Sequence, residues 1–235
     1  MKKNILVCVI LIVFFSDVHA SVIMNSTRII YPSHKKDISV TLVNNDSYPN
    51  LVQTWIDDGN PNSTPENAIK DFLIMPAVFK IQSKNTQVVR LIYTGNRLPK
   101  NKESIFYFNF LQIPPANNGH KSQGESGNKM LIMLKNRMKI FYRPDNLNMS
   151  FKSRMKDVLF FYKEKSIVAD NKSPYYMTID NIDINGTKLE GKMIEPYSKV
   201  SLKTNKISKF NYESKIKVTY INDQGGAEHF NYDLK

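Results

Sequence analysis

Cysteine is almost absent from this sequence. The 235 residues contain a single cysteine, Cys8, which lies in an apolar run close to the N-terminus. One cysteine cannot form an intramolecular disulfide or supply the thiolates of a structural zinc site. We therefore expect the stability of the folded protein to come from packed hydrophobic cores.

Long hydrophobic runs are scarce as well. The most apolar segment covers residues 5–15, which is shorter than the roughly 20 residues that a membrane-spanning helix needs. Lys2 and Lys3 precede this segment and Val18-His19-Ala20 follows it, which is the pattern of an export signal. We expect cleavage after Ala20, loss of Cys8 with the signal, and a soluble exported protein.

Motifs that carry catalysis or bind metals are missing. His34, His120 and His229 remain after removal of the signal, and they lie far apart in the sequence. No glycine-rich phosphate loop or Gly-x-Ser-x-Gly motif occurs, and Asp57-Asp58 stands in a pattern typical of a turn. We expect no metal, no cofactor and no enzymatic activity. A triad assembled from distant residues is an alternative that the sequence leaves open.

The charge of the chain is strongly one-sided. The formal net charge is +12 at pH 7. In a cytosolic protein this charge would suggest nucleic acid, but an exported chain meets none, and the lysines are scattered rather than clustered. We predict no nucleic-acid partner. The basic surface is either solvated or complements acidic protein partners.

The hydrophobic pattern favours strands over helices. Apolar residues alternate with a period of two, and helical spacing is not apparent, which indicates an all-β fold. The strands predicted for a first sandwich are 22–31, 38–43, 51–56, 78–82, 87–93, 105–112 and 130–142.

A change in composition after Tyr142 indicates a domain boundary. The following segment is polar, and Pro144 interrupts strand pairing. We predict a first domain over 21–143, a linker over 144–148 and a smaller β-sandwich over 149–235. Its predicted strands are 158–162, 175–184, 199–202, 216–221 and 229–232, with a tight turn at Asn185-Gly186.

Several motifs, in a fixed order, resemble those of a known family. They are residues 25–31 (NSTRIIY), 103–109 (ESIFYFN) leading to 113–115 (IPP), 139–144 (KIFYRP), 174–176 (PYY) and 220–226 (YINDQGG). Together they span almost the whole chain after residue 20. The set resembles the periplasmic chaperones that serve pilus and fimbrial subunits in the chaperone–usher pathway.

The resemblance implies a fold and a function. It implies two immunoglobulin-like β-sandwich domains set at an angle, with a cleft between them that binds pilus subunits. A periplasmic protein of this kind stabilises subunits by donor-strand complementation and delivers them to an outer-membrane usher without ATP. Whether free chaperones also associate with each other through the exposed donor strand stays open.

The segment before the KIFYRP motif is the predicted donor strand. A strand that completes another protein's sheet needs a free edge and apolar side chains at alternate positions. Met130, Ile132 and Leu134 form such a row, but Leu131 and Met133 are apolar too. Alternation alone favours an ordinary core strand equally. The resemblance assigns the partner-facing row to Met130, Ile132 and Leu134.

Two cations match the family's anchor for the C-terminal carboxylate of the subunit. The resemblance implies that Arg28 and Lys139 hold this group in the cleft. A buried carboxylate needs such partners because an unpaired buried charge is costly. Lys139 is out of phase with Leu134, so a bulge, a bend or a position at the strand end in the cleft must reconcile the two roles.

A charged triplet is expected to fix the angle between the domains. Arg90, Glu103 and Asp223 match the family's interdomain bridge, although without the resemblance they would be three unrelated surface charges. Individual surface ion pairs contribute only about 0 to 1 kcal/mol, so the expected role is geometric.

One feature departs from the family pattern, and two other functions compete with the one that the resemblance implies. The loop over 116–129 is long for the short-loop branch of the family, whereas the long-loop branch adds a disulfide that this chain cannot form. The branch therefore stays open. A secreted β-sandwich adhesin or pilus subunit is the alternative function, and an unrecognised hydrolase is a third hypothesis.

Overall fold

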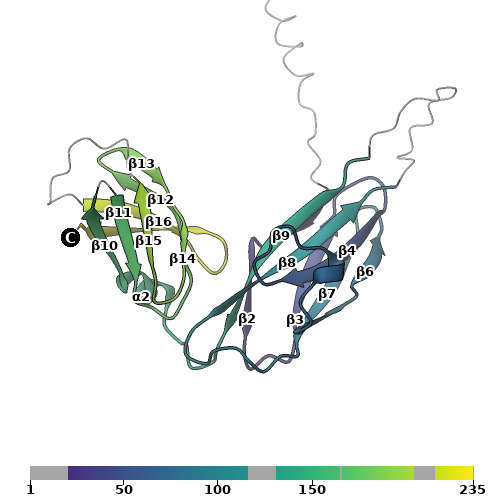
Figure 1. The fold of residues 1–235 in the computed structure, drawn as a ribbon. Helices are drawn as coiled ribbons and strands as arrows, with labels where there is room; N and C mark the ends of the chain where they lie inside the picture. Colours follow the sequence, from purple (N-terminus) through teal and green to yellow (C-terminus); the bar gives the residue numbers. More distant parts are fainter. Residues whose placement is uncertain (1–20, 116–130, 165, 204–214, 235) are drawn as a thin grey trace, which may run out of the picture.

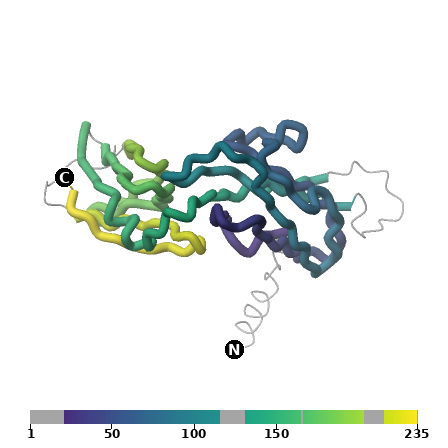
Figure 2. The backbone as a smooth tube through the Cα atoms, turned by 90° about the horizontal axis from the view of Figure 1, so that it is seen from below, coloured from purple at the N-terminus to yellow at the C-terminus, as the bar shows by residue number. Residues whose placement is uncertain are grey.

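The protein consists of two lobes of β-strands that meet at an angle (Figure 1). The structure is a computed structural model that describes residues 21–115, 131–164, 166–203 and 215–234. Figure 2 shows the same lobes turned by 90°, lying end to end. The prediction of an all-β fold with two sandwich domains is confirmed.

The first lobe is a sandwich of two sheets. One sheet has the order β1-β3-β7-β5 and the other the order β2-β9-β8-β4-β6. Its elements are β1 (Val22–Met24), β2 (Arg28–Pro32), β3 (Ile38–Asn44), β4 (Asn50–Asp57), η1 (Pro65–Asn67), β5 (Phe72–Met75), β6 (Val78–Ile81), β7 (Thr86–Tyr93), β8 (Ser104–Ile113) and β9 (Leu134–Arg143).

The core of this lobe follows from the period-two pattern. Val89 and Leu91 on β7 pack with Phe108 and Phe110 on β8, and all four side chains are fully buried. Because successive strand residues point to opposite faces, one face of each sheet supplies this core and the other faces outward.

The second lobe is a smaller sandwich with its own core. A three-stranded sheet has the order β10-β11-β15, and a second sheet has the order β13-β12-β16-β17, with β14 paired to β12. The elements are α2 (Phe151–Lys156), β10 (Val158–Lys163), β11 (Ser166–Asn171), β12 (Met177–Ile184), β13 (Thr187–Glu190), β14 (Met193–Ile194), β15 (Lys199–Lys203), β16 (Lys215–Ile221) and β17 (Ala227–Asp233).

The turn predicted at Asn185-Gly186 is confirmed. Both residues have positive φ angles, 51° and 83°, and they connect β12 to β13 with Ile184 paired to Thr187. Such left-handed angles are what a two-residue hairpin turn requires, and glycine and asparagine adopt them most readily.

Some predicted elements were wrong in extent. The single strand expected over 22–31 is two strands, since β1 pairs antiparallel with β3 whereas β2 pairs parallel with β9. The strand expected over 130–142 begins at Leu134, and Met130 lies outside the described residues. Periodicity also missed β5, β11, β13, β14 and the short helix α2, whose N-cap is Ser150. Among the described residues, no helix is long and apolar enough to cross a membrane.

Candidate functional site

Two cations from distant parts of the sequence lie side by side on one sheet. β2 runs parallel to β9, and the register pairs Arg28 with Lys139. Register partners on neighbouring strands point to the same face. That face is turned to the second lobe, because the ring of Phe141, two residues beyond Lys139, lies 5.7 Å from the ring of Tyr176.

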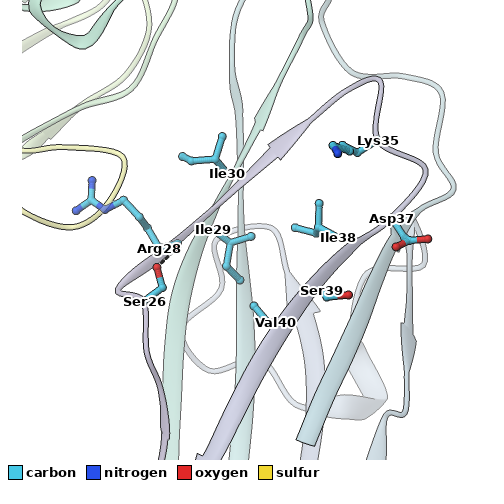
Figure 3. Close-up of a pocket in the computed structure, with 9 residues that line it drawn as sticks. All are labelled: Ser26, Arg28, Ile29, Ile30, Lys35, Asp37, Ile38, Ser39 and Val40. Atoms are coloured by element: carbon cyan, nitrogen blue, oxygen red, sulfur yellow. Dashed lines mark hydrogen bonds between the residues drawn. The ribbon is translucent and has the colours of Figure 1, made fainter.

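Arg28 is buried at the junction of the lobes. Its Nη1 donates a hydrogen bond to the carbonyl of Ile221 at 3.0 Å, while its Nε is buried with no hydrogen-bond partner among the described residues. In Figure 3 the side chain reaches away from β2 towards the yellow turn of the second lobe. Burial lowers the pKa of the guanidinium, and the nearby carboxylate of Asp223 opposes this change.

A pocket of about 470 Å³ lies beside Arg28, between β2 and β3 (Figure 3). Ile30, Lys35 and Ile38 contribute to its wall. Asp37 also lines it, but this carboxylate forms an ion pair with Arg90. Arg28 therefore keeps unused donor capacity although an acidic side chain lines the same pocket.

Lys139 is half-buried and has no counter-charge of its own. In the part of the chain that the structure describes, no carboxylate forms an ion pair with its ammonium. Burial, together with the positive charges of Arg28 and Arg137, lowers the pKa of this ammonium. Two adjacent cations without anions between them form a site suited to a carboxylate.

The phase of Lys139 needs no bulge. The ladder between β8 and β9 runs without a register shift from Ser104 opposite Tyr142 to Gln112 opposite Leu134. Leu134 and Lys139 therefore point to opposite faces of one regular strand. The predicted bulge is therefore absent from this ladder, and Lys139 lies inside β9, beside β2, rather than at the end of the strand.

One edge of β9 is open next to this site. β2 pairs with residues 139–143, and within the described part of the chain residues 134–138 pair with β8 alone. Leu134, the first of these residues, is 47% exposed, and Leu131, Ile132 and Met133 just before it are 48%, 60% and 54% exposed. An unpaired strand edge beside exposed apolar side chains is a template for another strand. The even-numbered and the odd-numbered residues of this segment are thus both exposed. Met130 lies outside the described residues.

A network of ion pairs joins the two lobes. Arg143 Nε donates to Glu103 Oε1 at 2.6 Å, and its Nη1 and Nη2 donate to Asp223 at 2.8 and 3.0 Å. Arg154 of α2 also contacts Asp223, at 3.1 Å. Glu103 accepts a further hydrogen bond from the backbone of Tyr176. Planar guanidinium groups suit such bidentate contacts.

Environment acts differently on the two carboxylates of this network. Burial raises the pKa of Glu103 despite the charge of Arg143. Burial also acts to raise the pKa of Asp223. The hydrogen bonds and positive charges of Arg143 and Arg154 outweigh burial and hold this pKa below the usual value. Asp223 is therefore the ionised centre on which the two arginines converge.

The assignment of Arg90 to this bridge is wrong. Arg90 lies on β7, in the other sheet of the first lobe, and its guanidinium pairs with Asp37 at 2.5 Å. Arg143 takes the expected place. Arg143 could have been predicted from the KIFYRP motif. By alternation it lies on the same strand face as Lys139 and Phe141, and that face is turned to the second lobe.

Glu103 and Asp223 are both in the network, as the sequence predicted, whereas Arg154 was missed. It comes from α2, a short helix that periodicity did not reveal, and its guanidinium carbon lies 3.9 Å from the ring centre of Tyr175. Among the residues that the structure describes, no group of His, Cys, Asp or Glu side chains is arranged to hold a metal ion.

Comparison with protein-family models gives two adjoining matches. Residues 21–148 match the model of the pili and flagellar-assembly chaperone PapD N-terminal domain. Residues 146–232 match the model of the pili assembly chaperone PapD C-terminal domain. Between them the two models cover nearly all of the chain after residue 20.

Individual relatives and structures agree with these models. The chain is 37% identical over 212 residues to the chaperone protein HifB of Haemophilus influenzae, covering 89% of this chain and 86% of the relative. It is 32% identical to the probable fimbrial chaperone YadV of Escherichia coli, covering 91% and 90%. The crystal structure of the YadV chaperone matches with a TM-score of 0.75 at 31% identity, covering 92% of this chain and 100% of that one.

Proposed function

Since the chain belongs to the pili assembly chaperone family, we propose that it is a periplasmic chaperone that holds a fimbrial subunit and delivers it to an outer-membrane usher. A structure of the SafA pilin in complex with the SafB chaperone of Salmonella enterica has the same fold, with a TM-score of 0.77 at 20% identity. The fimbrial subunit is the partner that we infer for this chain.

Strand addition is the proposed mode of binding. The open edge of β9 over 134–138 supplies unpaired backbone donors and acceptors, and Ile132 and Leu134 supply apolar side chains for an incomplete subunit core. Peptide addition to a sheet edge is a recurring mode, and chaperone–pilin complexes are a known example of it. Met130 completes the proposed donor row.

The observation that carries the proposal is the pairing of Arg28 with Lys139 across β2 and β9. Both cations are partly or fully buried without a counter-ion between them, beside the open edge. The C-terminal carboxylate of a subunit would satisfy both. A hydrogen bond to a charged group contributes roughly 1.5 to 3 kcal/mol, so this anchor fixes the register of the added strand.

The ion pairs between the lobes support this anchor. Arg28 is held by the carbonyl of Ile221, which adjoins Asp223 in the turn that the network fixes. We infer that Glu103, Arg143 and Asp223 maintain the lobe angle at which Arg28 meets the subunit. Release to the usher then needs no nucleotide, because another strand can replace the donor strand.

Co-expression with a fimbrial subunit in the periplasm tests this function. The wild-type chain should yield a stable 1:1 complex, and Arg28→Ala should reduce recovery of the subunit at least tenfold while the chaperone stays folded. Arg90→Ala, which removes an arginine on the other sheet, is the control and should leave recovery unchanged. Equal recovery with Arg28→Ala and wild type would contradict the anchor.

Export is testable in the same preparation. Mass spectrometry of the periplasmic protein should give a chain that begins at Ser21, since cleavage is proposed after Ala20. A mature protein that retains Cys8 would contradict this part of the proposal.

A further inference from the structure

The open segment of β9 is held from its outer face by residues to which the anchor and the donor row assign no role. We propose that Asp57 and Arg137 form a brace that keeps residues 134–138 extended before a subunit arrives. The inference rests on the proposed function, because it assigns positioning residues to the strand that would receive the subunit.

Strand pairing alone holds residues 134–138 less firmly than the rest of β9. Among the described residues, 134–138 pair with β8 on one side only, whereas residues 139–142 are flanked by both β8 and β2. A strand paired on one side frays more readily, and a disordered strand must lose conformational entropy when a partner binds. Preorganisation of this segment would therefore favour capture of a subunit.

Arg137 is the centre of the brace. It lies in the middle of the open segment, and its Nε and Nη2 contact Asp57 at 3.1 and 2.5 Å. Its guanidinium carbon also lies 3.5 Å from the ring centre of Tyr107 on β8. A bidentate ion pair combined with stacking on an aromatic ring holds the side chain in one orientation.

The carboxylate of Asp57 is held in position to pair with Arg137. The residue is 2% exposed, and its carboxylate accepts hydrogen bonds from Gly59 N, Ser63 Oγ and Asn109 Nδ2 at 2.8, 3.0 and 2.7 Å. Burial acts to raise its pKa, but the hydrogen bonds from Arg137 and Asn109 hold that pKa below the usual value. Three hydrogen bonds besides those from Arg137 therefore hold the carboxylate in position.

Lys135 adds a second attachment on the same face. Its Nζ donates to the carbonyls of Pro61 and Ser63 at 3.0 and 2.9 Å, and it lies 5.1 Å from the ring centre of Trp55. Trp55 Nε1 donates to Ser63 Oγ at 3.0 Å. The loop after β4 is thus fastened to the outward face of β9.

The brace has a consequence for the anchor as well. Arg137 is paired with Asp57, and the ammonium of Lys135 donates to backbone carbonyls. Lys139 is the next residue on this face, and it is left without an ion-pair partner among the described residues. The same contacts that hold the strand therefore reserve Lys139 for the incoming carboxylate.

Arg137→Met tests the brace, with Arg90→Met as the matched control. Arg90 also forms an ion pair with an aspartate at 2.5 Å, but on the sheet that does not contain β9. Amide hydrogen exchange is measured on the free proteins, followed by the rate at which each captures a denatured fimbrial subunit.

The brace predicts that Arg137→Met accelerates exchange at least tenfold at those amides of residues 134–138 that point to β8, with residues 139–143 unchanged. Subunit capture should slow several-fold, and Arg137→Lys should restore it only in part. Arg90→Met should change neither quantity. If Arg137→Met does not fold, Asp57→Asn, which keeps the size of the side chain, replaces it in the same comparison.

The brace would be overturned if residues 134–138 of the Arg137→Met variant exchanged their amide hydrogens at the wild-type rate. It would also be overturned if exchange became faster to the same extent along the whole of β9. The proposed function fails separately if the wild-type protein captures no subunit, because the exchange measurement uses the free protein and needs no partner.

Discussion

Arg28 and Lys139 are unfavourable residues for the free protein. Both are withdrawn from water, and the positive charge of Arg28 adds to the burial that lowers the pKa of Lys139. A lysine whose pKa is lower in the folded than in the unfolded chain disfavours folding while it is charged. This unfavourable contribution is fully present below the folded-state pKa and disappears as pH rises past the unfolded value of about 10.4.

Lys139→Met should therefore separate stability from function. At pH 7 we expect the free variant to unfold at an equal or higher urea concentration than wild type, and this difference should shrink as pH approaches 10.5. Subunit recovery should fall at least tenfold, because the anchor loses one of its charges. Lys188→Met on β13, where the lysine is exposed, is the control for both measurements. A destabilised Lys139→Met variant at pH 7 would contradict this account.

Single residues show what a sequence can and cannot specify. The order of motifs singled out Arg28 and Lys139, which lie side by side on one sheet. It also singled out Glu103 and Asp223, but it added Arg90 to a network that Arg143 forms. The choice depends on which sheet each strand joins, and strand pairing over long separations leaves little trace in local pattern. Asp57 was predicted to lie in a turn, which explains its bond to Gly59 but not its pairing with Arg137, 80 residues away.

At the scale of elements, β9 has two halves with different neighbours. Residues 139–142 are flanked by β2 and β8, while residues 134–138 have one edge that no described strand covers. Alternation predicted the strand itself but not its start, because apolar residues in both phases continue through 131–133. The split of residues 22–31 into β1 and β2 creates this division, since β2 covers only half of β9.

Leu134→Asp tests the donor row. A charge at the proposed contact with the open subunit core would have to be desolvated, so we expect subunit recovery to fall at least tenfold while the free protein keeps its stability. Val88→Asp is a matched control, because Val88 is 48% exposed on β7 and Leu134 is 47% exposed on β9. Equal loss of recovery in both variants would indicate a general effect of surface charge and would contradict a specific role for Leu134.

At the scale of the whole molecule, the lobes meet through a close steric contact as well as through ion pairs. Alongside the ion pairs, the turn that contains Gly225 lies against Thr27, next to Arg28. Gly225 has a φ of +88°, and a Cβ at this position would meet Thr27 Oγ1. Sequence motifs indicated two domains and a charged bridge, but this steric contact depends on how complete domains meet, which local pattern does not encode.

Gly225→Ala should therefore disturb the anchor by moving one lobe against the other. We expect a changed scattering profile of the free protein and a several-fold loss of subunit recovery. Gly186→Ala is the matched control, because Gly186 has a φ of +83° and a Cβ there would meet nothing within 4 Å. It carries the same backbone strain without the contact between lobes. If both variants behaved alike, backbone strain rather than lobe geometry would explain the loss.

We propose that a subunit adds a strand to the open edge of β9. Amide hydrogen exchange of the chaperone, free and in complex with a co-purified fimbrial subunit, tests it directly. We predict that amides of residues 134–138 that point away from β8 exchange freely in the free protein and become protected in the complex, while the amides of residues 139–143 change little. Unchanged exchange at residues 134–138 in a stable complex would contradict strand addition at this edge.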